Sequence, residues 1–325
     1  MRLLRLTLHR LAVSVPVLLI ILCGVFLVLQ LAPGDAVDAL LGQMGTADAT
    51  LAEQLREQYG LSGNAASRLV VYLWRLVRLD LGFSVSYNQP VLDVILSRLP
   101  ATLALVVSAL ALAFFAGAIV GVAAATKFGR WQDTLISLLG LVFYAAPSFW
   151  LGLMGILVFS VWLGWLPSGG LQDLSANYSG PRLVLDMARH LLMPTVTLAT
   201  IYFAIYLRVI RASMLEVLSL DFVRTARAKG LRESAVIYRH VLRNALLPMI
   251  TIIGLQAGAM LGGSVAIESV FSLPGLGRLA YEAVVQRDLN MLLGIVFMSS
   301  ILVIVINFAV DLLYAQIDPR IEAGA

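Results

Sequence analysis

The strongest constraint on this chain is that charged residues are missing from long stretches of its sequence. A bilayer core about 30 Å thick needs about 20 apolar residues in a helix, because each residue rises about 1.5 Å. Six stretches have this length or come close to it. The sequence therefore predicts an all-α integral membrane protein with six transmembrane helices. The stretches are 11–31, 99–126, part of the uncharged run 134–172, 191–207, 244–267 and 289–310.

The overall composition agrees with membrane spans. The chain is 60% hydrophobic and 13% charged, whereas a soluble domain carries about 25% charged residues. The net charge of +4 would suit nucleic acid, but the basic residues stand at the ends of apolar runs. That placement favours topology and anionic lipid as their role. We expect membrane lipid as a partner and no nucleic acid.

The first apolar run allows two interpretations. Arg2, Arg5 and Arg10 precede it, as basic residues precede the apolar region of a secretory signal peptide. The run is longer than such a region, and Leu29–Ala32 makes a poor small-residue cleavage site. We therefore expect an uncleaved first span.

Lysine and arginine in the loops indicate the orientation. Placing the N-terminus in the cytoplasm puts most of the 23 basic residues inside, including Lys127 and Arg130 in one short loop. An even number of spans then makes both termini cytoplasmic. The expected divisions are an N-terminal segment with the first span (1–32), an external loop or cap (33–98), a core with the other five spans (99–314) and a cytoplasmic tail (315–325). Within the core, spans are expected at about 99–126, 134–163, 190–212, 244–267 and 289–311, with an internal loop at 213–243.

Two loops have a pattern of their own. In the external loop, Thr50 to Gly60 predicts a short helix capped by Thr50 and ended by glycine, and Leu69–Leu79 predicts an amphipathic stretch at the level of the lipid headgroups. These could form a folded cap or a docking surface for an external partner.

Pro147 predicts a kink in the third span, and Pro167 with Gly169 and Gly170 predicts the exit from it.

The internal loop predicts a helix, a glycine turn and a second helix. Ser219 can cap a helix that begins at Asp221, and Arg227 and Lys229 suit the negative end of its dipole. Gly230 follows where a left-handed residue ends a helix. Glu233–Arg243 predicts the second helix, which leads into the fifth span. The alternative is a generic basic loop.

Small residues recur every four positions along two of the spans. Such spacing lets helix backbones approach closely. Packing within the chain, a subunit interface and the wall of a transport pathway all remain possible uses. The glycines concerned are Gly117 and Gly121 in the second span and Gly254, Gly258 and Gly262 in the fifth.

The sequence offers no catalytic or metal-binding pattern. His9, His190 and His240 are scattered, and Cys23 is the single cysteine, so an intrachain disulfide is impossible. Glu268 and Asp311 lie at span ends, where solvated carboxylates are the expectation. An ion-coupled carrier would more often carry charge near the midplane. We therefore do not expect an enzyme or an ion-coupled carrier. An ion-coupled carrier or channel and an intramembrane hydrolase are the rival classes.

The lysines of this chain exclude one nucleotide-binding motif, the phosphate-binding loop of P-loop ATPases. Lys127 and Lys229 are its two lysines, and neither follows a glycine, so no phosphate-binding loop of the form G-x-x-x-x-G-K-[ST] exists. If this chain belongs to an ATP-driven pump, the ATPase must be another chain.

Several segments resemble the first permease of the dipeptide, oligopeptide and nickel ABC importers. Asp221–Gly230 and its continuation through 239–248 resemble the cytoplasmic motif of that family, with Thr225, Ala226 and Arg227 where the general motif has Glu-Ala-Ala. Leu273 stands where the family often has tryptophan. Further matching segments are Asp80–Ser84, Leu99–Leu103, Pro147–Gly152, Trp162–Gly170, Val270–Gly277 and Asp318–Arg320.

The resemblance implies a type I importer of the bacterial cytoplasmic membrane. This subunit would pair with a second permease, two cytoplasmic ATPases would bind ATP and Mg, and an external binding protein would deliver short peptides. Nickel chelates, glutathione or another small solute are the alternative substrates, and no cofactor is expected in this chain. The implied ATPase-coupling residues are Asp221, Thr225, Ala226, Arg227, Ala228, Lys229 and Gly230. Glu268, Phe271 and Pro274 are the implied external gate or binding-protein contact.

Overall fold

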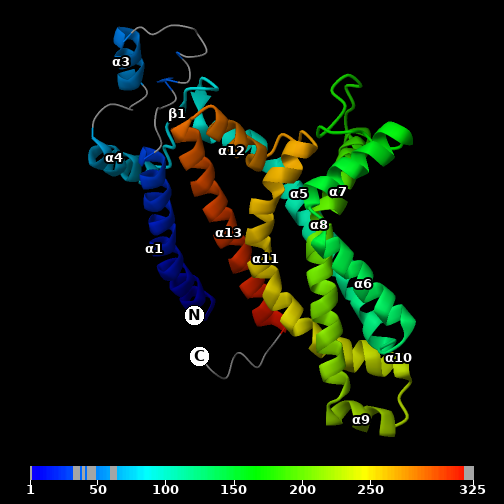
Figure 1. Ribbon diagram of the computed structural model, residues 1–325. Coiled ribbons are helices and arrows are strands. Elements are labelled where there is room, and N and C mark those ends of the chain that lie inside the picture. Colours follow the sequence, from blue (N-terminus) through cyan, green and yellow to red (C-terminus); the bar gives the residue numbers. More distant parts are fainter. Residues whose placement is uncertain (1, 32–36, 39–40, 42–48, 59–63, 318–325) are drawn as a thin grey trace. The chain divides into compact units, whose positions relative to one another are not determined.

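Helices make up most of the structure, a computed structural model that describes residues 2–31, 37–38, 41, 49–58 and 64–317 (Figure 1). The sequence prediction of an all-α protein holds apart from one hairpin of two short strands. The elements are α1 (Arg2–Leu31), α3 (Ala49–Gln58), α4 (Ala65–Val77), β1 (Phe83–Ser84), β2 (Gln89–Pro90), α5 (Val91–Thr126), α6 (Trp131–Ala145), α7 (Ser148–Gly155), the π-helix η1 (Ile156–Trp162), α8 (Pro181–Leu218), α9 (Asp221–Ala228), α10 (Glu233–Ala235), the π-helix η2 (Val236–Val241), α11 (Leu242–Val270), α12 (Leu276–Val285) and α13 (Leu289–Ile317).

Four helical stretches among the described residues are long and apolar enough to cross a membrane. They are Val91–Thr126, Pro181–Leu218, Glu233–Val270 and Leu289–Val310. The fourth predicted span, 190–212, therefore lies inside a helix that extends at both ends. In α1, Ser14–Val28 is a shorter apolar helix.

The third predicted span is broken rather than kinked. Helix α6 and the α7–η1 pair are bent by 98° at Ala146 and Pro147. Ala146 is extended, with ψ 131°, because a proline disfavours helical geometry in the residue before it. If the bent pair counts as one span, the described residues include up to five spans by length and composition. The single span expected at 134–163 is thus two helices at nearly a right angle.

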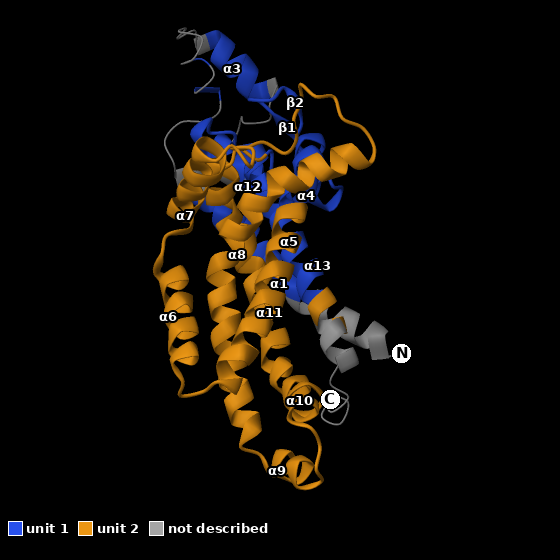
Figure 2. Cartoon of the chain, turned by 90° about the vertical axis from the view of Figure 1, so that its right-hand side faces the viewer, with its two compact units in different colours: residues 1–102, 274–308 blue, residues 103–273, 309–325 orange. Residues whose placement is uncertain are grey.

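The chain forms two compact units, each assembled from segments far apart in the sequence (Figure 2). Unit 1 comprises residues 1–102 and 274–308, and unit 2 comprises 103–273 and 309–325. The divisions expected from the sequence follow membrane topology, which these units do not test, and they stay a prediction. Each unit has its own hydrophobic core.

In unit 1, a buried carboxylate connects the hairpin to the start of α13. Asp288 accepts hydrogen bonds from the Ser84 hydroxyl (2.5 Å), from the Ser86 N–H (3.2 Å) and from the Met291 N–H (3.1 Å). Burial and the hydrogen bond donated to Glu282 raise the pKa of the Tyr87 hydroxyl to about 12. The segment 84–87 therefore contacts residues about 200 positions later in the chain.

The two helices α3 and α4, in the loop that the sequence predicts to be external, differ in detail from the sequence prediction. Helix α3 includes Thr50 in its first turn, so Thr50 is not the capping residue that was expected. Tyr59, Gly60 and the tail segment 318–325 lie outside the described residues. Helix α4 begins earlier than predicted because Asn64 caps it, accepting a hydrogen bond from the Ser67 N–H at 2.8 Å.

Candidate functional site

Helix α9 is the core of the candidate site, and it lies at the lower tip of unit 2 in both ribbon views (Figures 1 and 2). Val223 and Ala226 are buried and join the hydrophobic core of this unit. The other predicted coupling residues are exposed: Asp221, Thr225, Arg227, Ala228, Lys229 and Gly230. One apolar stripe thus fixes the helix to the unit and leaves a charged face open.

The start of α9 differs from the prediction. Ser219 ends the preceding helix α8, and its hydroxyl donates to the Glu216 carbonyl oxygen at 2.7 Å. Leu220 is the extended residue before α9, so the predicted cap by Ser219 is wrong. The hydroxyl of Thr225 donates to the Asp221 carbonyl oxygen at 3.0 Å, within the first turns of α9.

Gly230 has the left-handed conformation that the sequence predicted, with φ +75°. Its N–H donates to the Arg227 carbonyl oxygen at 2.9 Å, and the Lys229 N–H donates to the Thr225 carbonyl oxygen at 3.0 Å. Across the turn, Arg227 forms a two-pronged ion pair with Glu233, at 2.6 and 3.1 Å. The predicted helix, glycine turn and second helix are therefore present.

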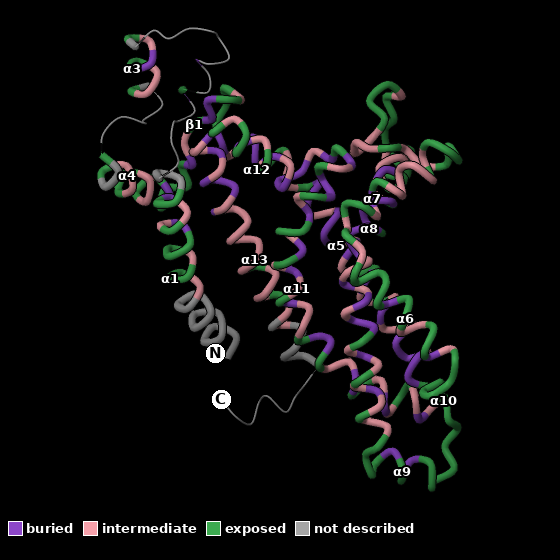
Figure 3. Tube along the Cα trace, in the orientation of Figure 1, coloured by how far each residue is buried: buried purple, intermediate pink, exposed green. Residues whose placement is uncertain are grey.

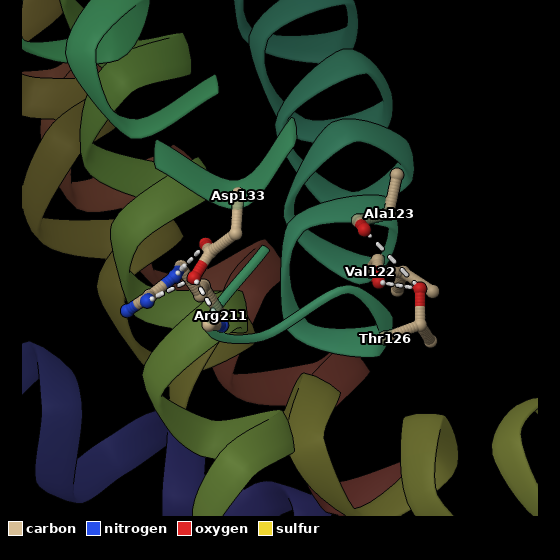
Figure 4. Close-up of polar contacts among 6 residues, drawn as sticks. Val122, Ala123, Thr126, Asp133 and Arg211 are labelled. Atoms are coloured by element: carbon tan, nitrogen blue, oxygen red, sulfur yellow. Dashed lines mark hydrogen bonds and ion pairs between the residues drawn. The ribbon is translucent and has the colours of Figure 1, made fainter. Parts of the chain in front are cut away.

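An ion pair that the sequence analysis missed holds the neighbouring turn against α8 (Figure 4). Asp133, at the start of α6, is 4% exposed. Arg211 of α8 donates to both of its oxygens, Nε to Oδ1 at 2.7 Å and Nη2 to Oδ2 at 2.8 Å. The N–H of Gly129 donates to the same carboxylate at 3.2 Å. A carboxylate just before the predicted span at 134–163 carries no sequence signal for a partner 78 positions away.

The predicted glycine positions fall into two groups. Gly117 and Gly121 of α5 lie against α8, so closely that a Cβ on Gly121 would be 2.9 Å from the Leu207 carbonyl oxygen. On α11, Gly254 is buried and Gly258 is half-buried, whereas Gly262 is exposed. The first stripe packs within the chain, whereas no described atom beyond its own helix lies within 4 Å of where a Cβ on Gly262 would be.

The three residues assigned to an external gate or contact also have different environments. Glu268 is completely buried, so the expectation of a solvated carboxylate at the end of the span is wrong. Phe271 is 1% exposed, and its carbonyl oxygen accepts a hydrogen bond from the Gly170 N–H at 2.8 Å. Pro274 is half-buried and begins the second segment of unit 1.

The site offers docking chemistry rather than catalytic chemistry. Within the described ranges, no group of three or more histidine, cysteine, aspartate or glutamate residues could hold a metal ion. The site has exposed charges on a short helix whose orientation is determined by a glycine turn and by the continuous helix from Glu233 to Val270. Such an arrangement can transmit the movement of a bound partner to a transmembrane helix.

The fold defines a class of membrane protein, the type I permease of ABC transporters. A chain of the MetNI methionine ABC transporter, in an inward-facing crystal form, matches with a TM-score of 0.56. The match covers 69% of this chain and 96% of that chain, at 19% sequence identity. Residues 117–323 match the family of binding-protein-dependent transport system inner membrane components, and the chain belongs to this family.

Full-length relatives are more similar in sequence. A putative peptide permease protein of Brucella ovis is 39% identical over 320 residues, which cover 98% of this chain and 99% of that protein. The oligopeptide transport system permease protein AppB of Bacillus subtilis is 39% identical, with 97% of this chain and 98% of the relative covered. The dipeptide transport system permease protein DppB of Alkalihalophilus pseudofirmus is 36% identical, with 97% and 98% covered.

Proposed function

We propose that this chain is a permease subunit of an ATP-driven importer of short peptides. The observation that carries this proposal is the similarity, over almost the whole chain, to proteins named as peptide, oligopeptide and dipeptide permeases. The exposed face of α9 supports it, because an importer subunit that lacks a phosphate-binding loop needs a surface that receives force from an ATPase.

The partners follow from this function. A second permease subunit completes the transport pathway, and two ATPase subunits bind ATP and Mg on the cytoplasmic side. An external binding protein delivers the peptide. Closure of the ATPases on ATP displaces α9, and the helix from Glu233 to Val270 carries that displacement into the membrane. Hydrolysis then resets the pathway.

Peptide uptake by the reconstituted complex tests the proposal. The chain is co-expressed with candidate second-permease and ATPase subunits from the same organism, and proteoliposomes are supplied with a candidate binding protein and labelled di- to pentapeptides. We expect uptake that requires ATP and the binding protein. The isolated permease should neither bind nor hydrolyse ATP. Uptake of a nickel chelate or of glutathione, without uptake of the peptides, would show that the importer has that alternative substrate.

The topology is part of the proposal: six spans, with both termini and α9 in the cytoplasm. Cysteine labelling in sealed cells checks it, in a background where Cys23 is replaced by serine. A cysteine at Asn64 should react with an impermeant maleimide, and one at Lys229 should react only after permeabilisation. The reverse pattern would overturn the orientation.

A further inference from the structure

The turn from Lys127 to Trp131, which joins α5 to α6, is a second exposed feature at the α9 end of unit 2. We propose that this turn is a binding site for the headgroups of anionic phospholipids, held in position by the Asp133–Arg211 ion pair. The inference does not depend on the transported substrate.

The position of the turn brings it close to the membrane surface. Helix α5 is long and apolar enough to cross a bilayer, α6 is apolar, and the turn between Thr126 and Trp131 is too short to extend far from either helix. In both ribbon views α9 extends beyond the lower end of α6 (Figures 1 and 2). The turn is therefore at headgroup level, and α9 reaches further from the membrane.

The side chains of the turn match an anionic lipid surface. Lys127 and Arg130 are exposed and supply two positive charges. Phe128 is 62% exposed and Trp131 is 70% exposed. Aromatic side chains are favoured at the membrane interface, and nearby basic residues are attracted to lipid phosphates. Two cations and two aromatic rings within five residues provide both kinds of contact.

The Asp133–Arg211 pair removes the main obstacle to this binding. An unpaired carboxylate next to the turn would repel an anionic headgroup, but both oxygens of Asp133 accept hydrogen bonds from Arg211. The guanidinium of Arg211 also lies over the Phe128 ring, 5.4 Å from its centroid. With the hydrogen bond from Gly129 to Asp133, these contacts connect the turn to α6 and α8. Figure 4 shows the Asp133–Arg211 pair.

Helix α6 continues the same surface toward the acyl chains. Leu135, Leu138 and Leu139 are each about half exposed, and Figure 3 shows exposed residues along the length of this helix. A lipid whose phosphate lies at Lys127 and Arg130 could extend its chains along these leucines. A protein partner that contacted the turn alone would leave that apolar face uncovered.

Native mass spectrometry of the purified permease complex tests the site. The complex is delipidated in detergent and titrated with phosphatidylglycerol or phosphatidylcholine. We expect the wild type to bind phosphatidylglycerol preferentially. In Lys127→Ser/Arg130→Ser that affinity should fall about 30-fold, because each basic residue near an anionic surface is worth roughly a factor of five. The matched control is Arg182→Ser/Arg189→Ser, which removes two exposed arginines near the other end of α8 and should change the affinity less than about twofold.

Fluorescence gives an independent readout. The difference in emission between the wild type and Trp131→Phe should be quenched more by brominated phosphatidylglycerol than by brominated phosphatidylcholine. An equal fall in phosphatidylglycerol affinity in the turn variant and in the control would overturn the proposal, because net charge alone would then explain the binding. Unchanged lipid affinity in the turn variant would also overturn it. If such a variant instead lost its ATPase subunits on purification, the turn would be a protein contact.

Discussion

Two glycines in unit 2, Gly230 and Gly169, are required for opposite physical reasons. Gly230 has φ +75°, and no described atom beyond its chain neighbours lies within 4 Å of where its Cβ would be. Gly169 is outside the left-handed region, but its Cβ would lie 2.4 Å from the Phe271 carbonyl oxygen. The first position requires glycine for its backbone angle, and the second requires it for space.

The comparison distinguishes a docking turn from a packed junction. Around Gly230 the open surroundings leave room for a partner surface, and the turn is held by local hydrogen bonds and by the exposed Arg227–Glu233 pair. At Gly169 the chain lies directly against the residue that follows α11. We therefore expect substitutions at Gly169 to affect stability first, and substitutions at Gly230 to affect coupling first.

The largest change in stability is expected for Gly169→Ala. The added methyl group meets backbone atoms, which cannot rotate away, and overpacking of this kind costs about 2–3 kcal/mol. Thermal unfolding of the purified chain in detergent measures it. Gly155→Ala is the matched control, since space is open there and the backbone is helical. If both variants unfold at the wild-type temperature, the close approach to Phe271 is not a constraint.

Asp133→Asn is expected to have the next largest effect. The variant leaves Arg211 without its charge partner in a mostly buried position, which costs about 2 kcal/mol of unfolding free energy. Arg211→Lys keeps the charge but cannot form two parallel hydrogen bonds. Its free energy of unfolding should therefore fall less than that of Asp133→Asn. Stability equal to wild type in Asp133→Asn would show that the α6–α8 connection depends on apolar packing alone.

Gly230→Val should change stability less but should alter coupling strongly. A branched side chain at φ +75° costs about 1–2 kcal/mol and adds bulk to the face of the turn. We expect the protein to insert normally while peptide uptake falls relative to ATP hydrolysis in the reconstituted complex. Arg232→Ala, an exposed neighbour, is the control. Wild-type uptake per ATP hydrolysed by Gly230→Val would favour the generic basic loop instead.

The smallest effect is expected for the Arg227–Glu233 pair. Both side chains are about half exposed, and such pairs contribute about 0.2–1 kcal/mol. A double-mutant cycle with Arg227→Ala and Glu233→Ala measures the interaction. A coupling energy as large as the effect of Asp133→Asn, about 2 kcal/mol, would mean that the Arg227–Glu233 pair stabilises its turn as much as the Asp133–Arg211 pair stabilises the turn at Gly129.

Patterns along a single helix were predicted well. The apolar runs identified α5, α8, α11 and α13, because the length of a span is a property of one segment. The left-handed Gly230 was also predicted, since the end of a helix depends on the few residues around it. The predicted cap at Ser219 was wrong because two local hydrogen bonds are possible for its hydroxyl. It donates to the Glu216 carbonyl oxygen of α8 and does not cap α9.

Contacts between distant segments were not predictable from one sequence. The pairs Asp133–Arg211 and Ser84–Asp288 join residues 78 and 204 positions apart, and both depend on which helices become neighbours. The burial of Glu268 is of the same kind, because a carboxylate at the end of an apolar run looks solvated until other elements cover it.

The sequence by itself determined that the chain is a helical membrane protein with a glycine-ended helix in a basic loop between two spans. These features depend on transfer of side chains into lipid and on backbone angles, which nearby residues control. The tertiary structure decided the right-angled break at Pro147, the glycines that packing requires, and the ion pair that holds the Lys127–Trp131 turn. Those depend on distances between segments, and such distances exist only once the helices have packed.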